Sequence, residues 1–404
     1  MSGPLSGYRI LDASTVFLGP YATSLLGDMG ADVVRIEAPG GDNMRHVGPA
    51  RHPGMAAMFL NINRNKRSAV LDLARPEGLA ALKRLAETAD VLLHNLRPKP
   101  AAKLGLTYAA FAAVNPRLVF CNAVGFGRNG PYCDRPAYDD IIQSMSGVAS
   151  LMARSLQGAP RYVPMAMADK TSGLMALSAI LAALIHRDRT GEGQEVELPM
   201  FETVASFALM DHMSGTAFEP PLGPTGYGRQ LSPYRRPFKT RDGHICVLPY
   251  TDKNWRDFFR VAGRPDLAAD PRFATLSSRT EHTEELYRLL DEIMTTRGSA
   301  EWMQALLGAD IPAAPVNSQD DLLDDPHLKQ VGFFEIFDHP SEGKLRYARA
   351  PMTFSRTPTA IRRGSPRLGE HTEEILAEAG YDRGEIEALL ASGAAGLPPG
   401  TETP

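Results

Sequence analysis

The stretch Met165–Arg187 reads MAMADKTSGLMALSAILAALIHR, and leucine and isoleucine recur in it at helical spacing after Gly173. This periodicity predicts a buried core helix that begins at or just after Asp169. Asp169 is the only acidic residue between Asp140 and Asp188. Two interpretations of it remain open at this point. It is either a helix N-cap that accepts a hydrogen bond from the first turn, or a nucleophilic carboxylate kept ionised by the positive end of the helix.

Toward the N-terminus, short apolar runs alternate with helical patterns. We expect strands at Tyr8–Leu11, Asp32–Glu37, Ser68–Leu73, Val91–His94 and Leu118–Val124, and helices at Pro20–Met29, 76–88 and Tyr108–Val114. This alternation predicts an α/β fold in which a parallel sheet is covered on both faces. Ligands of such sheets bind at the carboxyl ends of the strands. The candidate ligand site is therefore formed by the loops that follow the strands: Val16–Leu18, Ala38–Asp42, Asn95–Lys99 and Gly125–Gly130.

Changes in composition along the sequence divide the whole chain into segments. Residues 1–213 are assigned to a large domain, and the Gly-, Pro-, Tyr- and Arg-rich segment 214–236 to a linker or lid. A small α+β domain is expected at 237–325, where Asp242-Gly243 indicates a hairpin. In residues 326–404, strands are expected within Phe333–Ala350 and helices at Thr372–Ala379 and Asp382–Ala391.

Charge and composition exclude several classes of protein. A net charge of −4, without a run of Lys and Arg, gives no sign of a nucleic-acid surface. The uncharged stretch 171–185 is shorter than the ~20 apolar residues of a membrane span, and the N-terminus lacks the features of a signal peptide. Three cysteines in no metal-type pair favour a reducing, cytoplasmic setting.

Two short motifs each allow a functional interpretation and an ordinary structural one. GFGRNG at Gly125–Gly130 resembles a dinucleotide fingerprint, but Pro131 and Pro136 interrupt the helix that the fingerprint requires, so we reject nicotinamide binding. The cluster NINRNK, at Asn61–Lys66, is either a solvated positive loop or a set of donors for phosphate groups. No catalytic triad, nucleophile elbow or metal motif is evident in the sequence.

Several stretches together carry a resemblance to a known family. They are LSGYRILDAS, GADVVRIEAPGGDNMR, NRNKRSAVLDL, ADVLLHNLRP, NPRLVFCNAVGFGRNGPY, Asp169 itself, HRDRTGEGQEVELPMFE, DPRFAT, IPAAPV and LGEHT. In this order they resemble the class III CoA-transferase family, which includes the formyl-CoA and carnitine CoA-transferases. The resemblance implies a Rossmann-like large domain built from both chain ends, a small domain, and an interlocked homodimer. It makes Asp169 the nucleophile, with no metal, no tightly bound cofactor, and coenzyme A or acyl-CoA as a substrate.

The resemblance also implies a binding site for coenzyme A at the strand ends of the large domain. Ala38 and Ala74 stand where some relatives have a basic residue, so phosphate contacts are expected to shift to Arg45 or Arg75. The predicted binding residues are Val16, Phe17, Ala38, Arg45, Leu71, Asp72, Ala74, Arg75, Asn95, Leu96, Arg97, Lys103, Arg135, Ala137, Tyr138 and Asp139.

The chemistry implied by the resemblance passes through Asp169. Its carboxylate attacks an acyl-CoA thioester to give a mixed anhydride, and exchange through an aspartyl-CoA thioester then loads the incoming acid. Water must be excluded, because the anhydride would hydrolyse. The glycine-rich segment GPTGYG is the candidate lid, with N–H groups for an oxyanion; its predicted residues are Gly226, Tyr227, Gly228 and Arg229.

Other activities of the same fold are weighed against this one. Racemases and epimerases of acyl-CoA place a His–Asp pair where this chain has Ala137-Tyr138-Asp139, and the missing histidine argues against them. A non-catalytic CoA-binding protein is the second alternative. The denser glycine run of oxalate-specific relatives is absent, which disfavours oxalate. We expect a dicarboxylic or hydroxylated acid, held between the domains by an arginine of the lid such as Arg229 or Arg235.

Overall fold

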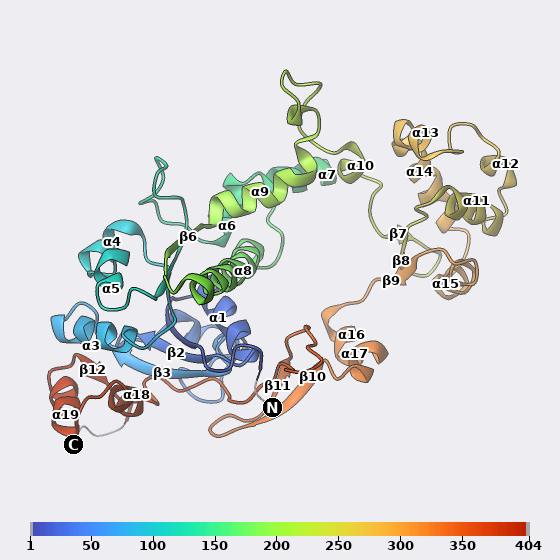
Figure 1. Cartoon of the computed structure of the whole chain (residues 1–404). Coiled ribbons are helices and arrows are strands. Elements are labelled where there is room, and N and C mark those ends of the chain that lie inside the picture. Colours follow the sequence, from blue (N-terminus) through green and yellow to red (C-terminus); the bar gives the residue numbers. More distant parts are fainter. Residues whose placement is uncertain (1–2, 401–404) are drawn as a thin grey trace. The chain divides into compact units, whose positions relative to one another are not determined.

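The computed structural model describes residues 3–400 of the chain. These residues form a seven-stranded sheet in the order β12-β3-β2-β1-β4-β5-β6 (Figure 1). Strands β1 to β6 run parallel to their neighbours, whereas β12 pairs antiparallel with β3. The predicted α/β fold with a mostly parallel sheet is confirmed. The strands are β1 (Arg9–Ala13), β2 (Asp32–Glu37), β3 (Lys66–Leu71), β4 (Val91–His94), β5 (Val119–Val124), β6 (Glu195–Pro199) and β12 (Ala395–Gly396).

Every residue of β3, β4 and β5 is buried, as expected for strands covered on both faces. Five of the seven strands were predicted to within about two residues, and β6 and β12 were missed. The helices between and after the strands are α1 (Leu18–Asp28), η1 (Asn43–His46), α2 (Ala57–Ile62), α3 (Pro76–Ala86), α4 (Pro98–Lys103), α5 (Tyr108–Ala112), α6 (Asp139–Met145), α8 (Met167–Thr190) and α9 (Met200–His212).

The chain divides into two compact units. The first contains the sheet and comprises the chain up to Ser146, Val163–Phe207 and the chain from Gln330; the second comprises Gly147–Tyr162 and Ala208–Lys329. Segment 214–236, predicted as a linker or lid, therefore packs with the second unit. Elements of that unit are α7 (Val148–Leu156), η2 (Ser214–Ala217), α10 (Gly228–Leu231), β7 (Phe238–Lys239), β8 (His244–Val247), α11 (Asp252–Val261), α12 (Pro265–Ala268), α13 (Leu276–Glu281), α14 (Thr283–Met294), α15 (Ser299–Gly308), β9 (Ala313–Pro315), α16 (Gln319–Asp324) and α17 (Pro326–Gln330).

The second unit has a core of its own. Strands β7, β8 and β9 form an antiparallel sheet, and the predicted Asp-Gly hairpin joins β7 to β8. Trp255, Phe258, Phe259 and Trp302 are buried together beside this sheet. Their rings contact one another at centroid distances of 5.7–6.3 Å.

The C-terminal segment completes the core of the first unit. It holds the hairpin β10 (Phe334–His339) and β11 (Gly343–Ala348), and the helices α18 (Thr372–Glu378) and α19 (Arg383–Ala391). Ile375, Leu376 and Leu389 of these helices are buried with residues of β1 to β5. Figure 1 shows α18, α19 and β12, in red, beside the blue strand β3.

The NINRNK cluster has a structural role, and the hypothesis that it holds phosphate is wrong. Lys66 is fully buried, with its Nζ 2.9 Å from a carboxylate oxygen of Asp12. Arg64 pairs with Asp28 at 2.7 Å, and Arg67 pairs with three carboxylates. Lys66 and Arg64 neutralise buried acids, and Arg67 pairs with partly exposed carboxylates, so these cations are already engaged within the chain.

Helix α8 begins two residues earlier than predicted. Its N-cap is Ala166, so Asp169 lies in the first turn and the N-cap interpretation of Asp169 is wrong. By length and composition alone, α8 is apolar enough to cross a membrane, a property that core helices share. Its Ala176, Ile180 and Leu184 are buried, which supports the prediction of a core helix.

Candidate active site

A cavity of about 340 Å³ lies in the first unit, at the carboxyl ends of β1, β4 and β5. This is the edge at which ligands of parallel sheets bind. Asp169 lines it, together with seven of the predicted CoA-binding residues: Val16, Asn95, Leu96, Arg97, Arg135, Ala137 and Tyr138. Residues that the prediction did not include also line it: Thr15, Leu18, Pro100, Ala123, Gly125, Pro136 and Met200.

Asp169 is mostly withdrawn from solvent in the first turn of α8. Burial and the nearby Asp139 carboxylate raise its pKa to about 7, while Lys170 lowers it. The expectation that the helix end keeps Asp169 fully ionised at neutral pH is therefore not met. A carboxylate that is poorly solvated and half ionised near neutrality is more nucleophilic than one in water, as covalent catalysis requires.

Asp139 anchors the start of α8 and does not line the cavity. Its Oδ1 accepts a hydrogen bond from the backbone N–H of Asp169 at 2.9 Å. Its Oδ2 accepts another from Gln143 Nε2 at 2.6 Å, and Gln143 Oε1 accepts one from the N–H of Val163 at 2.9 Å. Asp139 was predicted as a CoA-binding residue; here it makes the kind of capping contact that was one of the two interpretations of Asp169.

The loop between β1 and α1 forms one wall of the cavity and is held from two sides. Asn95 Oδ1 accepts from the N–H of Thr15 at 3.0 Å, and Asn95 Nδ2 donates to the Thr15 carbonyl at 2.8 Å. The N–H of Val16 donates to Asp42 Oδ2 at 3.0 Å. Val16 has φ = 69°, a left-handed conformation that is strained for a β-branched residue. These hydrogen bonds hold the loop against that strain.

A buried ion network lies behind the same loop. Arg35 is fully buried and pairs with Asp42, with Asp12 at 3.4 Å and with Glu37 at 3.5 Å. Burial raises the pKa of Asp12, but the charges of Lys66 and Arg35 outweigh this effect and lower it to about 2. Asp42 thus links this buried ion network to the backbone of Val16.

Two arginines of the cavity have no carboxylate partner among the described residues. Arg97 donates to the carbonyl of Asp134 at 2.8 Å, and Arg135 lies over the Tyr132 ring at 4.1 Å. Both side chains line the cavity that holds Asp169. A guanidinium without a counter-ion at the edge of a cavity is suited to bind phosphate.

The remaining predicted CoA-binding residues lie outside the cavity lining. Arg45 is buried, and it pairs with Glu37 at 2.6 Å and lies 3.8 Å above the Phe59 ring, so the structure contradicts its role as a phosphate ligand. Leu71 is buried in β3, and the Phe17 ring lies beneath Lys170. The others sit in loops or at a helix end: Ala38, Asp72, Ala74, Arg75 and Lys103.

The candidate lid lies in the second unit, where two of its N–H groups are already used. The N–H of Gly226 donates to the His212 carbonyl at 2.8 Å, and that of Tyr227 to His212 Nδ1 at 3.1 Å. They are therefore not free to stabilise an oxyanion, contrary to the prediction. Gly228 begins the short helix α10, and Arg229 lines a different cavity, in the second unit.

Sequence reasoning missed two features of the cavity. Met200 enters it from the start of α9, which follows β6, a strand that was not predicted. Gly125 is required by close approach, because a Cβ there would lie 2.4 Å from the Cβ of Ala137. No helix begins within Gly125–Gly130, which agrees with the rejection of the dinucleotide fingerprint.

Comparison with known proteins identifies the family. Residues 5–372 match the model of CoA-transferase family III. The chain is 34% identical to the succinate–glutarate CoA-transferase of Agrobacterium fabrum, over 93% of this chain and 95% of the relative. It is 32% identical to the formyl-CoA:oxalate CoA-transferase of Escherichia coli O157:H7, over 96% and 99%.

A solved structure shows the same architecture. The CAIB/BAIF family protein from Brucella suis superposes with a TM-score of 0.79 at 31% identity, covering 94% of this chain and 100% of that one. The match of sequence, fold and cavity extends over nearly the whole chain. The chain therefore belongs to CoA-transferase family III and is an enzyme of the CoA-transferase class.

Proposed function

We propose that this enzyme transfers CoA from an acyl-CoA to a small dicarboxylic or hydroxylated acid, with Asp169 as the covalent nucleophile. The observation that carries the proposal is the position of Asp169: a poorly solvated carboxylate in a cavity whose other polar groups include two arginines without carboxylate partners. The Agrobacterium fabrum relative supports the class of acid, because the acids in its name, succinate and glutarate, are dicarboxylic.

The reaction keeps the thioester energy in covalent bonds at each step. The ionised Asp169 attacks the thioester carbonyl, a C–O bond forms, the C–S bond breaks, and CoA leaves as a thiolate. The thiolate then attacks the Asp169 carbonyl of the mixed anhydride, which gives an aspartyl-CoA thioester and releases the donor acid. Attack by the acceptor carboxylate regenerates an anhydride and thiolate. Thiolate attack on the acceptor's acyl carbon yields the new acyl-CoA and free Asp169.

Coenzyme A is proposed to lie along the carboxyl edge of the sheet. Arg97 and Arg135 are suited to its phosphates, and Val16 and Tyr138 form walls of the same cavity. This set is smaller than the one expected from the resemblance, because Arg45 is engaged in the interior.

The structure favours this reaction over proton abstraction at an α-carbon. No histidine lines the Asp169 cavity. His94, which directly precedes the cavity residue Asn95 at the end of β4, is buried beside Phe120. Burial lowers the pKa of His94 to about 4. A racemase would lack an obvious second acid–base group here.

We also propose that the enzyme is a homodimer. Helices α8 and α9 expose large apolar side chains, a pattern typical of interaction surfaces. They include Leu174, Met175 and Ile185 on α8, and Phe207 and Met210 on α9, with exposed fractions between 47% and 82%.

Trapping the acyl-enzyme tests the reaction. Wild-type enzyme incubated with succinyl-CoA and hydroxylamine should carry a hydroxamate on Asp169 by peptide mass spectrometry, and Asp169→Ala should carry none. The proposal fails if Asp169→Ala exchanges succinyl-CoA with glutarate at the wild-type rate. Deuterium incorporation into a chiral acyl-CoA without exchange would identify a racemase instead.

A further inference from the structure

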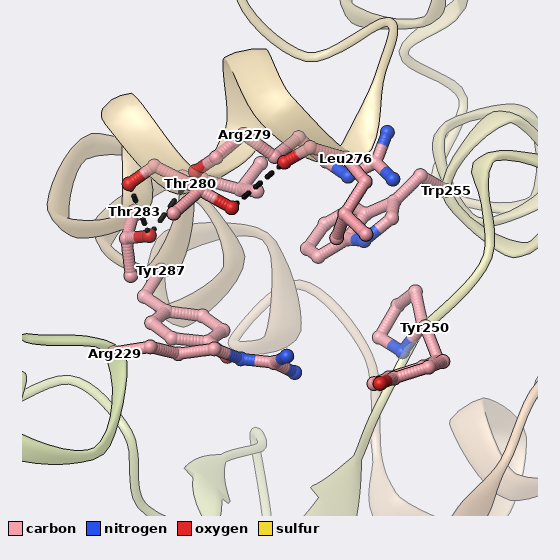
Figure 2. A pocket seen from close by; sticks show the side chains of 10 residues that line it. Arg229, Tyr250, Trp255, Leu276, Arg279, Thr280, Thr283 and Tyr287 are labelled. Carbon is pink, nitrogen blue, oxygen red and sulfur yellow. Dashed lines mark hydrogen bonds between the residues drawn. The ribbon is translucent and has the colours of Figure 1, made fainter. Parts of the chain in front are cut away.

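The second unit contains a small cavity of its own, and its lining shares no residue with that of the Asp169 cavity. Its lining includes Arg229 of α10, Tyr250 after β8, Trp255 of α11, Leu276 of α13 and Tyr287 of α14. Figure 2 shows the Arg229 guanidinium extending past the Tyr287 ring into the space that Tyr250 and Trp255 face. Two arginines and no carboxylate line this cavity.

Arg229 is the one cation of this cavity that lacks a counter-ion among the described residues. Its Nε–H donates to Tyr287 Oη at 3.0 Å, and its guanidinium lies 5.5 Å from the centre of the Tyr250 ring. The other arginine, Arg279, is buried, pairs with Asp252 and donates to the Phe273 carbonyl. Tyr227 and Tyr287 both interact with Arg229 through their side chains, and no carboxylate of the described residues competes with an anion for its terminal nitrogens.

The two threonine hydroxyls of the lining are already satisfied. Thr280 Oγ1 donates to the Leu276 carbonyl at 2.8 Å, and Thr283 Oγ1 donates to the Thr280 carbonyl at 2.9 Å (Figure 2). Leu276 and Tyr250 are 55% and 57% exposed, so the rim of the cavity is apolar. A ligand in this cavity would therefore meet the Arg229 guanidinium and, around it, mostly aliphatic and aromatic side chains.

The size of the cavity limits what part of a ligand it holds. Its volume is about 30 Å³, compared with about 340 Å³ for the Asp169 cavity. This space suits a group of roughly two or three atoms. A planar carboxylate matches the two parallel donors of a guanidinium, and the rest of the ligand would lie on the apolar rim.

We propose that this cavity binds one carboxylate of a small aliphatic dicarboxylic acid, with Arg229 as its partner. The choice of acid rests on the proposed transfer reaction, whereas the site itself does not involve Asp169. Of the two lid arginines considered from the sequence, only Arg229 lines a cavity; Arg235 is exposed. The structure thus reduces the earlier choice between Arg229 and Arg235 to one residue.

One of the two tryptophans of the chain reports on this site directly. Both are in the second unit: Trp255 lines the cavity, and Trp302 is buried in the core. Titration of full-length Asp169→Ala enzyme with glutarate, in the absence of CoA, should give a saturable change in tryptophan fluorescence without turnover. Succinate should behave similarly. Inorganic phosphate should compete at least about tenfold less well, because it has no aliphatic chain to pack on the apolar rim.

Substitutions on this background identify the binding residue. Arg229→Met should weaken glutarate binding by at least about tenfold, because a charged hydrogen-bond partner is lost. The control Arg264→Met removes an exposed arginine of the same unit, paired only with Asp266, and should leave the affinity within about twofold. Near-ultraviolet circular dichroism checks that both variants keep the wild-type fold.

Three outcomes would overturn the proposal: no saturable change with either acid, unchanged affinity in folded Arg229→Met, or phosphate binding as tightly as glutarate. These outcomes are separate from failure of the proposed reaction. The proposed reaction is tested by the exchange activity of Asp169→Ala, and this measurement does not depend on binding at Arg229.

Discussion

At the scale of single residues, the protonation of Asp169 links the structure to a measurable rate. Only the ionised carboxylate attacks the thioester, and its pKa is raised to about 7 by burial and Asp139. We expect kcat/KM for the acyl-CoA to rise with pH up to about 7 and then to level off. Initial rates across the neutral range check this expectation.

Asp139→Asn provides the matched change. The amide oxygen still accepts from the N–H of Asp169, but the negative charge that raises the Asp169 pKa is removed. The rising limb of the profile should move to lower pH. A limb that does not move would show that Asp139 has no electrostatic effect on Asp169.

The same raised pKa carries a cost in stability. When a carboxyl has a higher pKa in the folded chain than in the unfolded chain, its ionisation destabilises the fold. The destabilisation begins as the pH rises above the unfolded pKa and is complete above the folded pKa. Asp169→Asn should therefore raise the free energy of unfolding by about 1–3 kcal/mol at pH 8, and by almost nothing near pH 4. Denaturant unfolding at the two pH values measures the difference, and an equal gain at both would contradict the assigned pKa.

At the scale of elements, the hydrogen bonds that stabilise the β1–α1 loop also hold one wall of the Asp169 cavity in place. Asn95→Ala removes both hydrogen bonds to Thr15, so the strained Val16 is held only by Asp42. We expect a loss of about 1–2 kcal/mol in stability and a several-fold higher KM for acyl-CoA.

Asn115→Ala is the control for this prediction. Asn115 Nδ2 also donates to two backbone carbonyls, those of Ala86 and Ala89, but it lies outside the cavity lining. A similar loss of stability with an unchanged KM is expected. If both variants raise KM equally, the loop is not a specific support of the CoA site.

The parts of the structure that could be predicted from sequence follow from local pattern. Strand β4 reads VLLH, an almost continuous apolar run, and β2 reads DVVRIE, with Val33, Val34 and Ile36 among charged residues; both were predicted with their observed bounds. Strand β6 reads EVELP and is only half buried, and β12 has two residues; neither carries a pattern that separates a strand from a loop.

Side-chain partners were not predictable in the same way. The positive charge of Arg45 and Lys66 was visible in the sequence, but their buried partners were not. Lys66 on β3 meets Asp12 of β1 only in the assembled sheet, and Arg45 meets Glu37 only when the loop after β2 folds back. Sequence reasoning therefore assigned Arg45 to phosphate and left the cluster that contains Lys66 open between a solvated loop and a phosphate site. Asp169 was found because it stands alone in an apolar stretch, whereas Asp139, its partner in space, is separated from it by 30 positions.

At the scale of the whole molecule, the exposed apolar side chains of α8 and α9 predict self-association. Sedimentation velocity should show a dimer at micromolar concentration. Met210, the most exposed of these residues at 82%, provides the test. Met210→Asp should weaken the dimer without lowering the melting temperature of the subunit core, because its side chain makes little contact within the chain. A wild-type enzyme that sediments as a monomer would contradict the proposal.

The segment from Thr372 to Gly396 also determines when the first unit can finish folding. Helices α18 and α19 and strand β12 fill the same core as the strands made first, and Asn65 accepts from the N–H groups of Arg362 and Arg363. During synthesis, the edge of β3 that pairs with β12 therefore stays uncovered from the time β3 is made until residue 396 has been added. A truncation upstream of Thr372 would leave that edge permanently without α18, α19 and β12.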